Sequence, residues 1–556
     1  MTVSRRFLLT LTFSLLFSTI SYVSSCKAIS AKKIGMIPND VCYAAYNSNK
    51  LAVAFNNGYE VRINKKYYIG EADIDVHGDI SIKGSGSLIL VDSQCINVIS
   101  PISIDIKGIL ISTTKKVGSD SQIKLISNVG RNYHHHLRVK KCHISGVRIY
   151  THVADDVDQN MIKDGVHVFE FRNNVVDNVG YYLVRLDNCL CQSATIENNQ
   201  FHSFYSNIFG FGVSNEYSQT LLPRLKNLCV INNTFDNKAI IINEDYKYTY
   251  FTPIIAEGET IICRDNVFTN IIADTKSTEL AVYPFYLSGN NVIIEDNIIS
   301  DCLNISNSAY NEIFKCKSAF PGFAGNREII GNSVIVTDSV LQENIIGDMP
   351  YIRMINLQHD SWDTIIIKEN NLNLACDFVF GAGYRSEYKK FIFENNNIKY
   401  HSLGPKARSL LRLNPATEQD NNITVIGNKM YSHNRPTETY GLYLYDCNGY
   451  TITVKNNILS GALPYGAGST NYTLKYGVSE NNFIDVGSAK TPIRIAVNLS
   501  INDTISSEVS NEIIFYPQNW SHSVLIQFHD RFPNKIIIGN QNIQQSNITQ
   551  RFHHQF

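Results

Sequence analysis

The chain has 556 residues, more than one ordinary compact core accommodates, so it must form several domains or one elongated repeat. Hydrophobic residues make up 44% and charged residues only 18%, which excludes an intrinsically disordered chain. The 49 lysines and arginines nearly balance 50 acidic residues, so we expect no nucleic-acid partner, although a local basic surface is still allowed.

Residues 1–25 have the order of a signal peptide. Arg5 and Arg6 precede an apolar run, 7–20, that is too short to span a bilayer as a helix. Val23-Ser24-Ser25-Cys26 then resembles a bacterial lipobox, which implies lipidation of Cys26 after cleavage, with ordinary cleavage nearby as the alternative. We expect an exported cell-envelope lipoprotein on the periplasmic or surface face of the outer membrane, or otherwise a secreted protein. Its only contact with a membrane would be the anchor at Cys26.

Residues 26–90 are expected to form an N-terminal cap and the first rungs of a repeat. Asp40 suits the N-cap of a short helix that would cover the apolar end of the core. The apolar residues of this helix would be Val41, Ala44, Ala45, Leu51, Ala52 and Phe55. The segment from Gly58 to Ile69 then has the pattern of a first rung.

A short motif recurs along the centre of the chain. It consists of an apolar residue, two mostly polar residues, Asn, any residue and an apolar residue. The anchor residues are Asn174, Asn199, Asn233, Asn266, Asn297, Asn332, Asn370, Asn396, Asn428, Asn457 and Asn481. The flanks alternate apolar and polar residues and are rich in Ile, Val, Phe and Tyr, which indicates strands. Asn tolerates left-handed backbone and bonds nearby main chain, so it suits a corner where amides can stack from coil to coil. The pattern predicts a parallel β-helix over residues 91–500, followed by partial coils and a cap over 501–556.

The 12 cysteines show no metal-binding spacing. Most lie in apolar strand patterns, so we expect buried free thiols. His134-His135-His136 would lie on a strand, where consecutive residues point to opposite faces and cannot chelate one ion together. We therefore predict no metal site.

The segment from Tyr440 to Leu459, with its Cys447-Asn-Gly turn and Asn457 anchor, resembles the repeat of right-handed parallel β-helices of the pectate-lyase-like superfamily. Secreted bacterial polysaccharide lyases, the glycosaminoglycan lyases among them, are the members that it resembles. The resemblance implies an all-β solenoid with an N-terminal capping helix. It also implies that the Asn corner lies between the second and third strands of each coil, and that substrate binds along the first strand.

First strands should lie roughly 11–17 residues before each anchor Asn, with alternate residues outward. The outward residues would be cations, tyrosines and one amide, namely Arg185, Tyr283, Lys315, Lys317, Arg353, Arg412, Asn414, Tyr443, Tyr445 and Arg494. Carboxylates are nearly absent from this set. A ridge of one charge sign on one face predicts an anionic ligand.

β-Elimination from a uronic acid needs a cation to neutralise the carboxylate, a base, and a proton donor for the departing oxygen. We assign Arg353 and Arg412 as neutralisers, Lys315 or Lys317 as base, and Tyr443 or His359 as donor. The substrate-binding residues would be Arg185, Tyr283, Asn414, Tyr445, Arg494 and Tyr248. The predicted function is a monomeric lyase of an anionic polysaccharide such as chondroitin or dermatan sulphate, with pectin or alginate fitting almost as well.

Two other functions stay open. A glycoside hydrolase would need a carboxylate pair, for which Asp187, Asp360 and Asp446 are candidates. A non-catalytic carbohydrate-binding adhesin would need neither. We expect no required cofactor; calcium is the alternative neutraliser, held by acidic residues of a long loop at 244–247 and 257–259.

Overall fold

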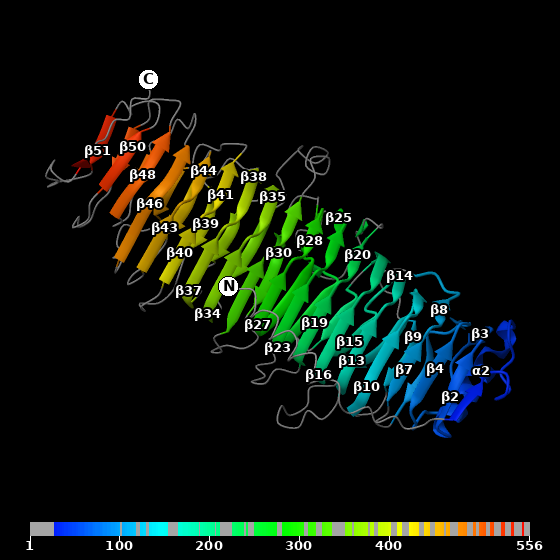
Figure 1. Ribbon diagram of the computed structural model, residues 1–556. Helices are drawn as coiled ribbons and strands as arrows, with labels where there is room; N and C mark the ends of the chain where they lie inside the picture. Colours follow the sequence, from blue (N-terminus) through cyan, green and yellow to red (C-terminus); the bar gives the residue numbers. More distant parts are fainter. Residues whose placement is uncertain are drawn as a thin grey trace, which may run out of the picture.

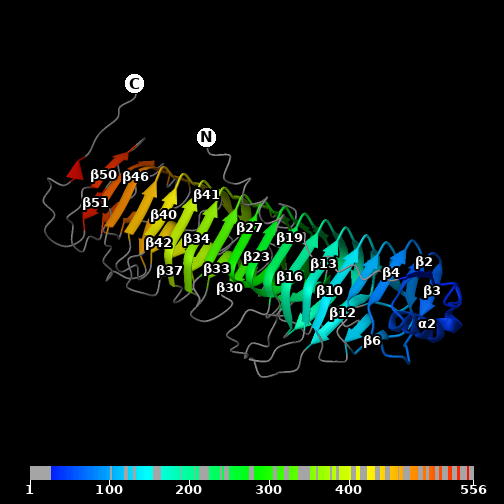
Figure 2. The same ribbon diagram turned by 60° about the horizontal axis from the view of Figure 1, so that its bottom comes forward.

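The computed structural model is a long solenoid of parallel strands, with α2 at one end and the C-terminal strands at the other (Figure 1; Figure 2). Among the described residues, 44 strands form one sheet. This confirms the predicted fold class, an all-β parallel β-helix with an N-terminal capping helix. At some strand positions, including Lys315, Arg353 and Arg412, only the backbone is described. The described residues are 27–99, 103–117, 123–128, 133–153, 165–187, 189–205, 207–211, 225–237, 241–242, 250–274, 281–304, 310–317, 325–335, 351–357, 361–375, 378–382, 387–401, 408–413, 422–432, 439–444, 451–460, 463–467, 476–485, 493–495, 500–506, 512–515, 524–528, 535–538 and 548–549.

A complete coil has three strands, and strands of successive coils pair in parallel to give three faces. Face 1 precedes the Asn corner and contains β1 (Lys27–Ser30), β2 (Tyr59–Ile63), β4 (Ile80–Gly84), β7 (Ile104–Lys107), β10 (Tyr133–Lys140), β13 (Gly165–Arg172), β16 (Leu190–Glu197), β19 (Leu225–Ile231), β23 (Ile254–Arg264), β27 (Phe285–Glu295), β31 (Asn326–Ile330), β34 (Ser361–Lys368), β37 (Glu387–Glu394), β40 (Asn422–Ile426), β43 (Thr451–Lys455), β46 (Tyr476–Asp485), β48 (Ser500–Ser506), β50 (Val524–Phe528) and β52 (Ile548–Thr549).

Face 2 follows the Asn corner. It contains β3 (Lys66–Ile69), β5 (Ser87–Leu90), β8 (Leu110–Thr113), β11 (His143–Ser145), β14 (Val175–Val179), β17 (Gln200–Phe204), β20 (Thr234–Asp236), β24 (Val267–Thr269), β28 (Ile298–Ser300), β32 (Ser333–Ile335), β35 (Asn371–Ala375), β38 (Asn397–His401), β41 (Lys429–Ser432) and β44 (Ile458–Ser460).

Face 3 closes each coil. It contains β6 (Gln94–Val98), β9 (Lys124–Asn128), β12 (Arg148–Val153), β15 (Val184–Asp187), β18 (Phe209–Phe211), the first residues of β23 and β27, then β30 (Tyr310–Lys317), β33 (Tyr351–Leu357), β36 (Phe378–Ala382), β39 (Arg408–Leu413), β42 (Thr439–Leu444) and β45 (Leu463–Ala467). Three smaller sheets comprise β21 (Ile241–Ile242), β25 (Ile272–Asp274) and β29 (Leu303–Asn304); β22 (Tyr250–Phe251) and β26 (Ala281–Val282); and β47 (Ile493–Ile495), β49 (Glu512–Phe515) and β51 (Lys535–Ile538).

The N-terminal cap consists of a 3-10 turn, η1 (Val41–Tyr43), and the helix α2 (Ala44–Asn56). Asp40 caps it as predicted, because its carboxylate accepts a hydrogen bond from the Cys42 N–H at 2.9 Å. Leu51 and Phe55 are fully buried, whereas Val41 is 52% exposed, so the expectation that Val41 faces the core is wrong. Among the described residues, no helix has the length and apolar character needed to cross a membrane.

Aliphatic and aromatic side chains fill the solenoid, and equivalent positions stack from rung to rung. On face 2 the rings of Phe201, Phe235 and Phe268 lie parallel with 4.7 Å between successive centroids, which is the strand spacing itself. All three rings are fully buried. The period-two alternation of the sequence thus becomes a continuous apolar core that runs along the axis.

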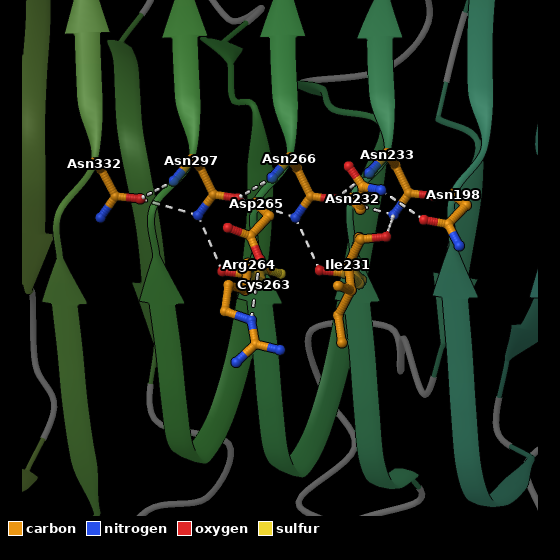
Figure 3. Close-up of polar contacts among 11 residues, drawn as sticks. Asn198, Ile231, Asn232, Asn233, Cys263, Arg264, Asp265, Asn266, Asn297 and Asn332 are labelled. Carbon is orange, nitrogen blue, oxygen red and sulfur yellow. Dashed lines mark hydrogen bonds and ion pairs between the residues drawn. The ribbon is translucent and has the colours of Figure 1, made fainter. Parts of the chain in front are cut away.

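The corner asparagines form a buried ladder, of which Figure 3 shows one part. Asn297 is typical. Its Oδ1 accepts hydrogen bonds from the backbone N–H and the Nδ2 of Asn266, each at 3.0 Å, while its Nδ2 donates to the Cys263 carbonyl and to Asn332 Oδ1. Each amide therefore accepts from the preceding coil and donates to the following one. The predicted stacking of corner amides is confirmed from Asn174 onward.

The ladder differs from the prediction in two respects. The left-handed residue at each corner is the one before the ladder Asn, as at Asn173 (φ 55°), Asp265 (φ 57°) and Asn456 (φ 56°), so backbone strain and amide pairing belong to different residues. The last ladder asparagine is Asn482, because its Nδ2 donates to Val454, whereas Asn481 has a left-handed φ of 55°. The motif selects Asn481, because apolar Val478 lies three residues before it whereas Ser479 lies three residues before Asn482. The strand pairing shifts register between Glu480 and Phe483, and the ladder position moves by one residue.

Asp503 ends the ladder among the described residues. It accepts from the Asn482 N–H at 3.0 Å and from Asn482 Nδ2 at 2.9 Å, and it also bonds the Ser479 hydroxyl. A terminal residue needs only to accept, so a carboxylate serves where an amide would otherwise be needed. Burial raises the pKa of this carboxyl above its ordinary value.

This raised pKa predicts a pH-dependent stability. The folded state holds the proton more tightly than the unfolded state, so the free energy of unfolding falls as pH rises through the folded pKa and recovers on acidification. We expect Asp503→Asn to raise that free energy by about 1 kcal/mol at neutral pH, with the gain vanishing at low pH. Thermal unfolding across pH would measure it, with Asp363→Asn, an exposed carboxyl paired with Lys389, as the control. A gain that is constant with pH would contradict the assignment.

The described cysteines are free thiols and most of them are buried, as predicted. Burial raises the pKa of Cys95 and Cys191 to about 12 and that of Cys142 to about 11, whereas Cys42 is exposed. Because the thiolate is the reactive form, we expect iodoacetamide to modify Cys42 in the folded protein and to reach the other three only after unfolding. Peptide mass mapping would show this; equal labelling of Cys95 and Cys42 would contradict it.

Candidate functional site

One register column runs the length of face 3. Strand pairing aligns Asn97, Ser127, Thr151, Arg185, Gly210, Ile255, Tyr286, Lys315, Asn356, Gly381, Arg412, Tyr443 and Gly466. We call this set the face 3 column. Four of the predicted site residues therefore share one line: Arg185, Lys315, Arg412 and Tyr443. None of the column residues is acidic.

The register sets the spacing within this line. Arg412 and Tyr443 are direct partners on neighbouring strands β39 and β42, about 4.8 Å apart along the axis. Lys315 lies three rungs before Arg412, or roughly 14 Å. Arg412 and Tyr443 thus occupy neighbouring positions of the line, whereas Lys315 lies further along it.

Arg185 lies among tyrosines at the N-terminal part of the column. Its Nη1 donates to the Tyr181 hydroxyl at 3.0 Å, and its guanidinium carbon lies 5.0 Å from the centre of the Tyr182 ring. Gly210, the next column residue, is required here because a Cβ would lie 2.7 Å from Tyr182 Cε1. The tyrosines therefore hold the guanidinium at a set position on the outer surface of face 3.

Two further cations adjoin this cluster, and the sequence pattern missed both. Arg148 is 4% exposed and places its guanidinium 4.5 Å from the centre of the Tyr181 ring. Lys124 is the register partner of Arg148, and burial together with that neighbouring charge lowers its pKa. Neither lies 11–17 residues before an anchor Asn, the signal by which the first strands were located, since Asn174 follows Arg148 by 26 residues and Lys124 by 50.

Tyr283 does not lie in the face 3 column. It precedes β27 and is 7% exposed, so its predicted outward position is wrong. Val282 belongs to β26 and the face 3 strand begins only at Phe285, which makes Tyr286 the column residue. The two rings meet edge to face at 5.9 Å. Alternating apolar residues fitted either register, and the additional strand β26 decided between them.

Arg353 is also displaced along its strand. It pairs with Glu312 and Phe378, three positions before the column, and the column residue of β33 is Asn356. Lys317 pairs with Ser288, two positions after the column. The structure thus brings Arg412, but not Arg353, into line with Lys315.

The remaining predicted residues fall in two groups. Arg494 lies in β47, within the smaller sheet of β47, β49 and β51, and pairs with Ile514. The others lie outside the described residues, so their roles stay predictions: Cys26, Tyr248, His359, Asn414 and Tyr445.

The acidic segment 257–259 is not in a loop, contrary to expectation. Glu257 and Glu259 lie within strand β23. The described part of the chain contains no group of three or more His, Cys, Asp or Glu residues placed to hold a metal ion. Within the triple histidine, His134 is fully buried and His135 is exposed, as expected for alternating strand residues.

Comparison with known proteins identifies no family. No family model matches the chain, and no curated protein matches it. Among solved structures, it is similar to a tailspike protein double mutant of E. coli bacteriophage HK620, at 11% identity and a TM-score of 0.27, covering 94% of this chain and 80% of that one. It is also similar to the gp42 tailspike of Acinetobacter phage vb_AbaP_AS12, at 9% identity and a TM-score of 0.19, covering 88% and 64%. Similarity at this level transfers no activity to the chain.

Proposed function

We propose that this protein cleaves a uronic-acid-containing anionic polysaccharide by β-elimination on face 3. A glycosaminoglycan such as chondroitin or dermatan sulphate is the substrate class that suits it best. The observation that carries the proposal is the register column in which Arg185, Lys315, Arg412 and Tyr443 align without an acidic residue. A linear polyanion laid along the axis would meet these positions in succession.

The reaction is assigned to Arg412 and Tyr443 because they are on adjacent rungs. The Arg412 guanidinium would pair with the uronate carboxylate and stabilise the charge that develops when the neighbouring carbon loses its proton. The same positive charge would favour the Tyr443 phenolate, which takes that proton as the base. The C–O bond to the next sugar then breaks, a C=C bond forms, and the phenol returns the proton to the departing oxygen. Lys315 would bind a sugar further along.

The alternatives are less well supported. A glycosidase pair of Asp187 and Asp360 is not favoured by the strand order. Asp187 lies on β15, which is five rungs or about 24 Å from β33, the strand that precedes Asp360 in the sequence. Paired carboxylates of glycosidases lie within about 10 Å of each other. Asp360 and Asp446 lie outside the described residues. An adhesin would need only the cationic and aromatic surface, and cleavage distinguishes it from an enzyme.

The location of the protein is part of the proposal. Export by the N-terminal signal and attachment through a lipid on Cys26 would place a monomeric enzyme at the cell envelope, where extracellular polysaccharide is encountered. The activity would need no cofactor if Arg412 neutralises the carboxylate, and calcium if it does not.

The experiment is incubation with chondroitin sulphate, dermatan sulphate, pectate and alginate, each with calcium and with chelator. Rising ultraviolet absorbance from unsaturated chain ends is expected for at least one polymer. New reducing ends without that absorbance would replace the lyase with a hydrolase. Binding without new ends would replace it with an adhesin.

A further inference from the structure

A second line of cations lies on face 1, at the N-terminal end of the solenoid. Strand pairing aligns Arg62, Lys83, Lys107, Lys140 and Arg172 on five successive rungs. We call these five residues the basic stripe. Strands β2, β4, β7, β10 and β13, which carry it, lie side by side (Figure 1).

The same register column changes character further along the chain. Beyond Arg172 it continues through Glu197, Ile231, Arg264, Glu295, Ile330, Lys368, Glu394, Ile426, Lys455 and Glu480. In that part, Lys368 pairs with Glu394 at 2.8 Å and Lys455 with Glu480 at 2.7 Å. This part of the column therefore places opposite charges on neighbouring rungs, with Ile231, Ile330 and Ile426 between the pairs. The five rungs from Arg62 to Arg172 carry cations alone.

Nearby carboxylates neutralise only part of the basic stripe. Lys83 pairs with Glu60 at 2.7 Å and with Asp105 at 3.6 Å. Lys140 pairs with Glu170 at 2.7 Å, and Arg172 pairs with Glu197 at 2.9 Å. Glu170 is shared by Lys140, Arg138 and Arg172. Although burial acts to raise its pKa, the hydrogen bond from Lys140 and the surrounding charges hold that pKa below its ordinary value.

The least neutralised cations are Lys107 and Arg62. Lys107 is exposed and has no ion pair among the described residues, and Arg62 has a 60% exposed side chain at 3.6 Å from Glu60. Like charges on directly opposite strand positions destabilise a sheet. A bound anion at each rung would remove that cost.

We infer that the basic stripe is a second binding surface for a linear sulphated or carboxylated polysaccharide, separate from face 3, that holds the polymer without cleaving it. The cations repeat at the strand spacing of about 4.8 Å in a straight line, which suits a thin chain with regularly repeated anions. The stripe and its neighbouring column, Glu60, Ser81, Asp105, Arg138 and Glu170, carry no aromatic residue on which bases could stack, so single-stranded nucleic acid fits less well.

The test compares two double variants on the same face. Arg62→Gln/Lys107→Gln removes the two least paired cations, and Lys368→Gln/Lys455→Gln removes the same charge from the C-terminal part of the column. Each is combined with Arg412→Gln, so that binding is measured without cleavage. The readout is the fluorescence anisotropy of labelled chondroitin sulphate in low salt, with neutral dextran as the blank.

We expect the stripe variant to bind roughly tenfold more weakly and with a shallower salt dependence, and the control variant to match its parent. The stripe variant should also unfold at an equal or higher temperature in low salt, because repulsion is removed. Equal affinity of both variants would overturn the inference, as would binding of the parent to vesicles of anionic lipid but not to the polysaccharide. A missing lyase activity would leave this test unaffected, since it scores binding alone.

Discussion

Replacing Asn297 with alanine is expected to lower the free energy of unfolding by roughly 4 kcal/mol. Asn297 is fully buried, and its amide serves two donors of Asn266 and two acceptors on Cys263 and Asn332. A buried polar group that loses its partner costs about 1–3 kcal/mol, and alanine would leave several such groups at the centre of the ladder. The coils on either side should also exchange their amide hydrogens faster.

Asn227→Ala is the matched control. Asn227 is a half-buried outward residue of β19, so the same substitution should change stability by less than about 0.5 kcal/mol. Thermal unfolding and hydrogen exchange measure both variants. Similar losses at Asn227 and Asn297 would show that the ladder amides contribute no more than surface ones. If Asn297→Ala does not accumulate as folded protein while Asn227→Ala does, the ladder is the cause.

Arg412→Gln is expected to reduce kcat/KM on the uronate polymer by about 10²–10³-fold. A cation that stabilises developing negative charge contributes mainly in the transition state, so the loss should appear in kcat more than in KM. Gln keeps much of the length of the side chain and removes the charge. Initial rates of absorbance increase at several polymer concentrations give both constants.

Arg353→Gln is the comparison that the register suggests. Arg353 lies three positions from the column, opposite Glu312, so its loss should change kcat/KM by less than about threefold. Tyr443→Phe should resemble Arg412→Gln, because the phenol is the proposed base and proton donor. If Arg353→Gln were the damaging substitution and Arg412→Gln the mild one, the reaction centre would move toward β33.

Much of the fold could be read from the asparagine motif. A residue that stacks on its own equivalents must recur once per coil, so the spacing of Asn174, Asn199 and Asn233 predicts a solenoid before any contact is known. The exact position failed at Asn481 and Asn482, where the strand pairing shifts register. The function of each depends on φ, which sequence letters do not carry.

The candidate site was harder to predict because strand register is a property of pairs of strands. A shift by an odd number of residues exchanges the two faces of a strand. The column residue lies three positions later than predicted in two strands, at Tyr286 instead of Tyr283 and at Asn356 instead of Arg353. Lys315, Arg412 and Tyr443 were placed correctly in the column, although Arg353 is flanked by apolar residues in the same way. Arg148 and Tyr181 were missed because Tyr181 lies in a turn before β15 and meets Arg148 only across neighbouring coils.

The sequence gives the number of acidic and basic residues, which nearly balance, but it does not show which of them are neighbours in the fold. By itself the sequence determined that the chain is an elongated all-β repeat with an asparagine corner. The alternation within each strand and the recurrence of the asparagine motif along the chain are both visible without knowledge of any contact. Only the tertiary structure decided which charges stand in line, because hydrogen bonding between coils sets neighbours that are 21 to 41 residues apart, as in Arg62, Lys83 and Lys107 or Lys315 and Asn356. Equal numbers of acids and bases thereby become a mixed C-terminal column, an acid-free column on face 3 and a basic stripe on face 1.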